Sequence, residues 1–181
     1  MEDTTAHTTP PWNVTFLELF ESCCAKYKSG NDDFETYYDE ESSAFLKAIG
    51  HKPREFFDFV EDFCDGYDIA PSTALLVAAV RRDYFLTVQK GVLSTADEIK
   101  PSDLSAKDSE LDGIVWLPRI LVKARGKLAG NLDPNIMYSC GGDRAFLARH
   151  GLHAADFLRV VWAAGDNDAR VASYVKTGKW E

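Results

Sequence analysis

Residues 44–65 read AFLKAIGHKPREFFDFVEDFCD, and residues 145–166 read AFLARHGLHAADFLRVVWAAGD. The two segments align without a gap and share apolar, glycine and acidic positions. The shared residues are Ala44, Phe45, Leu46, Gly50, Phe56, Val60 and Asp65 in the first segment, and Ala145, Phe146, Leu147, Gly151, Phe157, Val161 and Asp166 in the second. Because one register holds all of these residue types, the match predicts a duplicated structural unit.

The hydrophobic residues around both segments recur at helical spacing. The pattern predicts a first helix that begins near Trp12 and ends at Ser29-Gly30. Further helices are predicted over residues 39–49, 53–65, 72–89, 115–129, 143–150, 153–164 and 166–176. No region shows the alternation or the β-branched runs that strands require. We therefore expect an all-α protein of two related helical units, produced by an internal duplication and packed as a compact helical bundle.

Composition divides the chain into four segments. Residues 1–9 are predicted to be a disordered leader, and residues 10–91 the first helical unit, a diverged copy. Residues 92–111 are predicted to be a linker, because Ser, Asp, Lys, Glu and Ala dominate there and apolar residues are isolated. Residues 112–181 form the predicted second unit.

The negative charge of the chain lies in its first half. The protein has 20 Lys and Arg against 29 Asp and Glu, for a formal net charge of −9. Residues 1–91 hold 8 basic and 17 acidic residues, whereas residues 92–181 hold 12 of each. Since nucleic acids and anionic membranes attract basic surfaces, this balance argues against both as partners.

The cell compartment is predicted from two further features. The longest apolar run, residues 74–80, is far shorter than the roughly 20 residues of a membrane-spanning helix. The N-terminus carries acidic residues where a secretory signal would carry positive charge. We therefore expect a cytoplasmic protein whose 4 cysteines are free thiols.

One stretch of the second unit, residues 113–132, contains four cations and no acidic residue. On a helix, Arg119, Lys123 and Lys127 form a basic edge beside the apolar stripe, and Arg125 lies on the other flank. Gly126 leaves room there for a backbone or a ligand. The predicted ligand-binding residues, for a phosphate or a carboxylate, are Trp116, Arg119, Lys123, Arg125 and Lys127. The alternative is that these cations form salt bridges with the acidic first unit or with another subunit.

The segment after this helix reads Tyr138-Ser139-Cys140-Gly141-Gly142-Asp143. It brings a phenol, a thiol and a carboxylate together, so Cys140, Tyr138 and Asp143 are the candidate catalytic residues, with His150 or His153 nearby. A buried structural thiol is the alternative for Cys140. Zinc ligation by Cys140, Asp143, His150 and His153 is disfavoured because no paired cysteine motif is present, and no metal site is predicted.

Several of these residues belong to one longer pattern. It comprises Gly113-Ile114-Val115-Trp116-Leu117-Pro118-Arg119, Lys123-Ala124-Arg125, Lys127-Leu128-Ala129-Gly130 and Tyr138-x-Cys140. Over residues 112–178 the sequence resembles DUF5069, a bacterial family of small proteins without an assigned function. The resemblance implies a compact helical domain and a shared polar site that includes Arg119, Lys123, Arg125, Tyr138, Cys140 and Asp143. The chain departs from the family pattern at Val122, where the family has Asp, and at Ser139, where it has Asn. It also departs at Gly141-Gly142, where the family has other residues between Cys and Asp.

Three functions are compatible with these patterns. The first is binding of an anionic small molecule at a basic pocket of the second unit that contains Tyr and Cys. The second is an enzyme that uses the same pocket, with Cys140 or Tyr138 as the catalytic group. The third is an interaction module whose acidic first unit binds a protein partner or a second copy of the chain. The sequence identifies no cofactor.

Overall fold

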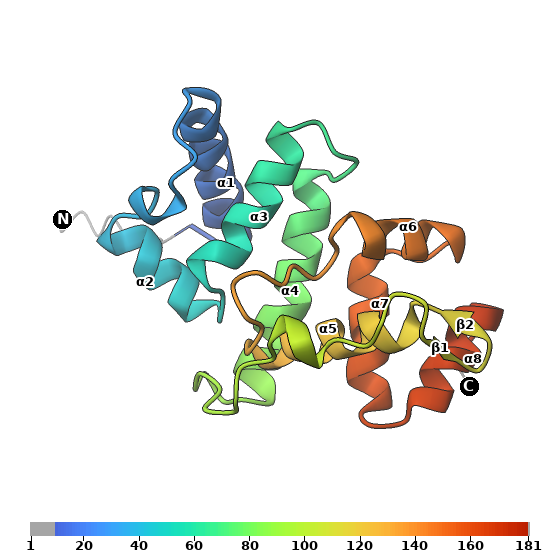
Figure 1. Ribbon diagram of the computed structural model, residues 1–181. Coiled ribbons are helices and arrows are strands. Elements are labelled where there is room, and N and C mark those ends of the chain that lie inside the picture. Colours follow the sequence, from blue (N-terminus) through green and yellow to red (C-terminus); the bar gives the residue numbers. More distant parts are fainter. Residues whose placement is uncertain (1–9, 181) are drawn as a thin grey trace, which may run out of the picture.

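The computed structural model describes residues 10–180, and this part of the chain is all-α apart from one small two-stranded sheet. The predicted leader, residues 1–9, lies outside the described residues. The α-helices are α1 (Trp12–Lys28), α2 (Glu40–Ala48), α3 (Pro53–Cys64), α4 (Pro71–Thr87), α5 (Leu117–Ala129), α6 (Gly141–Arg149), α7 (Ala154–Ala164) and α8 (Asp168–Thr177) (Figure 1). The all-α prediction is confirmed, and the ends of the helices differ from the predicted ends by at most two residues.

The first unit is built around aromatic contacts between α1 and α3. Pro53 occupies the first turn of α3, where its missing N–H costs nothing. The Glu55 carboxylate accepts a hydrogen bond from the Lys52 N–H (3.1 Å) at the start of that helix. At the next residue, the ring of Phe56 meets Phe16 of α1 edge to face, with centroids 4.9 Å apart. These contacts fix α1 against α3.

Helix α4, the last helix of the first unit, packs against both units. It contacts α1 and α3 on one side and α5 and α7 on the other, as Figure 1 shows. The fully buried Arg81 of α4 donates a hydrogen bond to Gln89 Oε1 (2.6 Å), and Gln89 Nε2 donates to the Ala129 carbonyl at the end of α5 (3.0 Å). The buried apolar side chains of both units form one continuous core.

The repeated segments have matching local structure. Helices α2 and α6 are both nine residues long and occupy equivalent positions of the two repeats. Each helix is followed by a glycine with positive φ, Gly50 (+72°) and Gly151 (+64°). The residue after each glycine donates its N–H to a carbonyl of the preceding helix. These bonds are His51 to Leu46 and Leu152 to Leu147, both at 2.9 Å. An origin of these units by duplication remains a prediction from the sequence.

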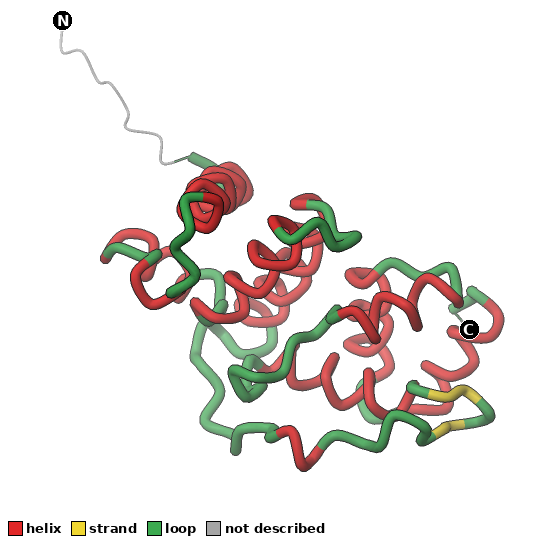
Figure 2. The backbone as a smooth tube through the Cα atoms, turned by 45° about the horizontal axis from the view of Figure 1, so that its top comes forward, coloured by secondary structure: helices red, strands yellow, loops and turns green. Residues whose placement is uncertain are grey.

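Residues 92–111, which the sequence predicts to be a linker, pack against the second unit. The Ile99 N–H donates to the Asn131 carbonyl (2.9 Å), and the Asp133 N–H donates to the Ile99 carbonyl (3.0 Å). A short 3₁₀ helix, Pro101–Asp103, follows. Figure 2 shows this segment running along the outside of the molecule toward the two strands.

The two strands are a feature that the sequence patterns did not predict. Glu110–Leu111 (β1) and Ile114–Val115 (β2) pair antiparallel. Asp112 and Gly113 join them with φ of 54° and 75°, the conformation of a tight hairpin turn. Strands of two residues are too short for alternation to reveal them.

None of the helices in residues 10–180 is long and apolar enough to cross a membrane.

Gly50 and Gly151 provide a matched test of the packing between α2 and α4. Replacement of either by Ala forces a side chain into the left-handed region, at a cost of about 1–2 kcal/mol. A Cβ on Gly50 would lie 2.6 Å from Phe85 Cγ, whereas a Cβ on Gly151 would meet nothing within 4 Å. The clash should add about 1–3 kcal/mol to the cost of Gly50→Ala.

Urea unfolding of the two variants measures this difference. We expect Gly50→Ala to lower the free energy of unfolding clearly more than Gly151→Ala. Equal losses would contradict the close approach of Phe85 to Gly50.

Candidate functional site

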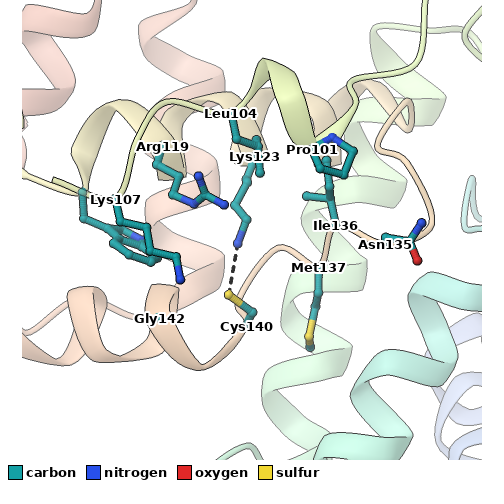
Figure 3. Close-up of a pocket in the computed structure, with 11 residues that line it drawn as sticks. Pro101, Leu104, Lys107, Arg119, Lys123, Asn135, Ile136, Met137, Cys140 and Gly142 are labelled. Carbon is teal, nitrogen blue, oxygen red and sulfur yellow. Dashed lines mark hydrogen bonds between the residues drawn. The ribbon is translucent and has the colours of Figure 1, made fainter. Parts of the chain in front are cut away.

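A cleft of about 400 Å³ lies on the second unit, between α5, the start of α6 and the segment that precedes the strands. Figure 3 shows the side chains around it. The lining residues are Pro101, Leu104, Lys107, Trp116, Arg119, Lys123, Asn135, Ile136, Met137, Cys140 and Gly142. Four residues that the sequence predicted for the site are among them: Trp116, Arg119, Lys123 and Cys140. No carboxylate belongs to the lining.

The carboxylate of Asp143 lies beneath the cleft and joins three parts of its wall. Asp143 is fully buried in the first turn of α6. Its Oδ1 accepts a hydrogen bond from Trp116 Nε1 (2.9 Å). Its Oδ2 accepts from Lys123 Nζ (2.7 Å) and from the Ser139 N–H (3.0 Å). These three donors compensate a charge that would otherwise be expensive to bury.

Two residues bonded to Asp143 have unusual backbone conformations. Trp116 and Ser139 have φ of 77° and 70°, in the left-handed region that costs a side-chain-bearing residue about 1–2 kcal/mol. The indole of Trp116 also packs on Gly142, where a Cβ would lie 2.4 Å from Trp116 Cζ2. The bonds to Asp143 and the absence of a side chain at Gly142 hold the indole against the start of α6.

Lys123 and Cys140 meet in the middle of the cleft. The ammonium group of Lys123, 4% exposed, donates a hydrogen bond to Cys140 Sγ (3.1 Å) in addition to its bond with Asp143. Cys140 is the residue that precedes the first turn of α6, and it is half-buried. Figure 3 shows the Lys123 amine pointing toward this sulfur. Because Asp143 balances the charge of Lys123, this part of the cleft is nearly neutral.

The positive charge of the cleft comes from Arg119 and Lys107. Arg119 donates from Nη1 to the Ser105 carbonyl (2.6 Å), and its guanidinium lies 5.7 Å from the centre of the Trp116 ring. Lys107 is exposed. Within residues 10–180 neither cation forms an ion pair with a carboxylate. Figure 3 shows both cations at the same end of the cleft.

Lys127, the third member of the predicted basic edge, leaves the cleft and enters the interface between the units. It is 2% exposed, and its ammonium lies 3.5 Å from Glu55 Oε1 of α3. Burial lowers the pKa of Lys127, while the charge of Glu55 acts in the opposite direction. Lys127 therefore forms the salt bridge to the acidic first unit that was the alternative prediction for these cations.

Arg125 also lies away from the cleft. It forms an ion pair with Asp168 of α8 and donates to the Gly165 carbonyl (2.9 Å), so it joins α5 to the end of the second unit. The neighbouring Gly126 is not open, in contrast to the predicted surface for a ligand. A Cβ there would lie 2.3 Å from Leu132 Cδ2 and 2.8 Å from Ile99 Cδ1. The space beside Gly126 is therefore filled by the side chains of Leu132 and Ile99.

The remaining predicted polar residues have structural partners. The buried Tyr138 hydroxyl donates to the Ala154 carbonyl (2.7 Å), and burial raises the pKa of Tyr138 well above its usual value. His153 Nδ1 accepts the Ala155 N–H (3.2 Å) at the start of α7. The ring of His150 packs on Phe146, with centroids 4.8 Å apart. Residues 10–180 contain no group of three or more His, Cys, Asp or Glu arranged to hold a metal ion.

Sequence patterns missed the wall opposite α5. Lys107, Leu104 and Pro101 come from the segment that was predicted to be a linker, and Ile136 and Met137 come from the loop before α6. Nothing in the composition distinguishes Lys107 from other lysines in polar segments. An apolar residue at Leu104 is the one weak signal, because isolated apolar residues in a polar segment often pack on the body of a protein.

Comparison with known proteins supports the predicted family. Residues 102–179 match the family model described as Domain of unknown function (DUF5069). The match begins within residues 92–111, which is the segment that packs beside the cleft. The chain has no match among curated proteins or solved structures.

The central position of Asp143 can be tested with two matched substitutions. Asp143→Asn leaves the buried Lys123 without its counter-charge, and removal of one partner of a buried pair costs about 3–5 kcal/mol. Asp168→Asn removes the partner of Arg125, whose side chain is 33% exposed, so its cost should be below about 1 kcal/mol. Chemical denaturation of both variants provides the comparison. Losses of similar size would show that Asp143 is not the support of this wall.

Asp58, which adjoins Glu55 and Lys127 at the interface between the units, should make stability depend on pH. Burial raises the pKa of Asp58 from 3.8 to about 7, although Arg54 and Lys127 act against this shift. Between about pH 4 and 7 the folded carboxyl keeps a proton that the unfolded one has lost, so rising pH favours unfolding.

Asp58→Asn removes this titration. The free energy of unfolding of Asp58→Asn minus that of wild type should increase as pH rises across that interval. The increase should be at most about 4 kcal/mol. Urea unfolding at several pH values measures the difference, with the exposed Asp68→Asn as control. A difference between Asp58→Asn and wild type that stays constant with pH would contradict the raised pKa.

Proposed function

We propose that this chain, whose residues 102–179 match the DUF5069 family model, binds an anionic small molecule in the cleft beside α5. The ligand carries a phosphate or a carboxylate. Arg119 and Lys107 bind the charged group, Lys123 and Cys140 form the floor, and Trp116 forms one side. The cleft, at about 400 Å³, falls within the range of about 300–1,000 Å³ that is usual for small-molecule sites.

The observation that carries the proposal is which of the cations on α5 have a carboxylate partner. In a chain with 29 acidic residues, Lys123, Arg125 and Lys127 each have a carboxylate partner. Arg119 has none among the described residues, and it faces a cleft whose lining holds no acidic side chain. A guanidinium has five N–H donors, of which one is used by the Ser105 carbonyl. The others remain for an anion, which arginine can bind in a bidentate manner.

The start of α6 adds favourable electrostatics. No side chain caps this helix, and two residues at its N-terminus, Cys140 and Gly142, line the cleft. Free N–H groups and the positive end of the helix dipole favour a negative charge at such a position. This contribution supports the two cations and does not replace them.

The enzyme alternative rests on Cys140. Of the three candidate catalytic residues, Cys140 lines the cleft, whereas the Tyr138 hydroxyl and the Asp143 carboxylate are buried and hydrogen-bonded. A thiol beside an ammonium group is an arrangement found at nucleophilic cysteines. The lining holds no His, Asp or Glu that could serve as a general base for Cys140, so anion binding is the function that the geometry favours.

Thermal unfolding in the presence of anions tests the proposal. Phosphate or citrate at ten times its dissociation constant stabilises the folded state by about 1.4 kcal/mol. For a protein of this size that raises the melting temperature by about 3–6 °C. We expect this increase in wild type and not in Arg119→Gln.

A control variant separates binding from general salt effects, because phosphate and citrate stabilise many proteins by exclusion from their surfaces. Arg159 of α7 is exposed and lies outside the cleft lining, so Arg159→Gln should respond to anions as wild type does. The same increase in wild type, Arg119→Gln and Arg159→Gln would contradict a site at Arg119.

A further inference from the structure

The two ends of the cleft differ in chemistry. Figure 3 shows Lys107 and Arg119 at one end, and Pro101, Asn135, Ile136 and Met137 at the other. Lys123 and Cys140 lie between the two ends. A ligand that fills the cleft therefore contacts cations at one end. At the other end it contacts three apolar side chains and the amide residue Asn135.

The size of the cleft exceeds what an inorganic anion needs. A cavity of about 150 Å³ is enough to hold benzene, and the cleft measures about 400 Å³. It has room for a phosphate at the cationic end together with a ring-sized apolar group at the other. A phosphate alone would leave the apolar end in contact with water.

The apolar end is supported by the core of the protein but not filled by it. Ile136 is 4% exposed and belongs to the buried core. Met137 packs against that core and is partly exposed; it lines this cleft and also two neighbouring hollows beside α3. Leu104 also packs against the core, and Figure 3 shows it near Lys123, between the two ends. A thioether side chain adapts to ligands of different shape. This end therefore presents a surface that gains free energy when an apolar group covers it.

From this division we infer that the ligand is an amphipathic anion: a phosphate or carboxylate joined to an apolar group about the size of one ring. The charged group binds Arg119 and Lys107, and the apolar group lies against Ile136 and Met137. This inference rests on the proposed function and names the class of ligand for the same site. Inorganic phosphate is then a weak ligand that occupies the cationic end alone.

Isothermal titration of the protein with phenyl phosphate and with inorganic phosphate tests the inference. Burial of a phenyl ring against apolar side chains should make phenyl phosphate bind at least tenfold more tightly, which corresponds to about 1.4 kcal/mol. Phenol, which has the ring without the charge, should bind at least tenfold more weakly than phenyl phosphate.

Three variants assign the two parts of the ligand to the two ends. Met137→Ala should weaken phenyl phosphate several-fold and leave inorganic phosphate unchanged. Arg119→Gln should weaken both anions. Leu86→Ala, at an exposed apolar residue of α4 outside the cleft, should leave both dissociation constants unchanged.

The reactivity of Cys140 locates the ligand independently of the heat signal. Cys140 lies between the two ends of the cleft, whereas Cys64 of α3 is also half-buried but does not line the cleft. Saturating phenyl phosphate should slow alkylation of Cys140 by iodoacetamide at least threefold and leave the rate at Cys64 unchanged, as measured by peptide mass spectrometry. Unchanged alkylation of Cys140, or equal slowing at both cysteines, would overturn the assignment to this cleft.

The outcomes separate the inference from the function on which it rests. If inorganic phosphate binds as tightly as phenyl phosphate and both depend on Arg119, the anion site stands and the amphipathic ligand is overturned. If neither anion binds, or if phenol binds as tightly as phenyl phosphate, the proposed function is overturned and the inference with it. Tighter binding of phenyl phosphate that depends on both Arg119 and Met137 supports the inference.

Discussion

The cleft of the second unit depends on one buried carboxylate. Asp143 binds the Trp116 indole, the Lys123 ammonium and the Ser139 N–H within 3.0 Å, and thereby joins both ends of the wall formed by α5 to the start of α6. Since Trp116 and Ser139 have left-handed backbone conformations, neither would hold its position from local preference alone. The fold stabilises these conformations through hydrogen bonds to a charge that has no contact with water.

The four cations of α5 have four different roles. Lys127 is directed into the interface with the first unit, where Glu55 is its partner, and Arg125 connects α5 to α8. Lys123 balances the buried Asp143. Arg119 alone of these four has no carboxylate partner within residues 10–180 and faces the cleft. The acid-free stretch of sequence therefore contributes to the structure along most of its length and to the proposed binding site at its N-terminal end.

The sequence predicts the helices well because every helix buries one face. Hydrophobic residues therefore recur along it at helical spacing. It also indicates the region of the cleft, since Arg119, Lys123 and Cys140 lie within one short segment. Such patterns do not predict ion pairs between residues that are far apart in the sequence. Nothing near Lys127, for example, identifies Glu55 as its partner. The packing of residues 92–111 is beyond such patterns for a related reason: their few apolar residues lie on the second unit, and Lys107 reaches the cleft through that packing. The short hairpin has too few residues to show alternation.

The central claim is that the unpaired cations of the cleft bind an anion. A crystal structure of the protein with 4-bromophenyl phosphate tests it most directly, because anomalous scattering locates the bromine. We expect phosphate density against Arg119 and Lys107 and a bromine peak beside Met137. A cleft without ligand density in crystals grown at saturating ligand, or an Arg119 turned away to a carboxylate of its own chain, would contradict it.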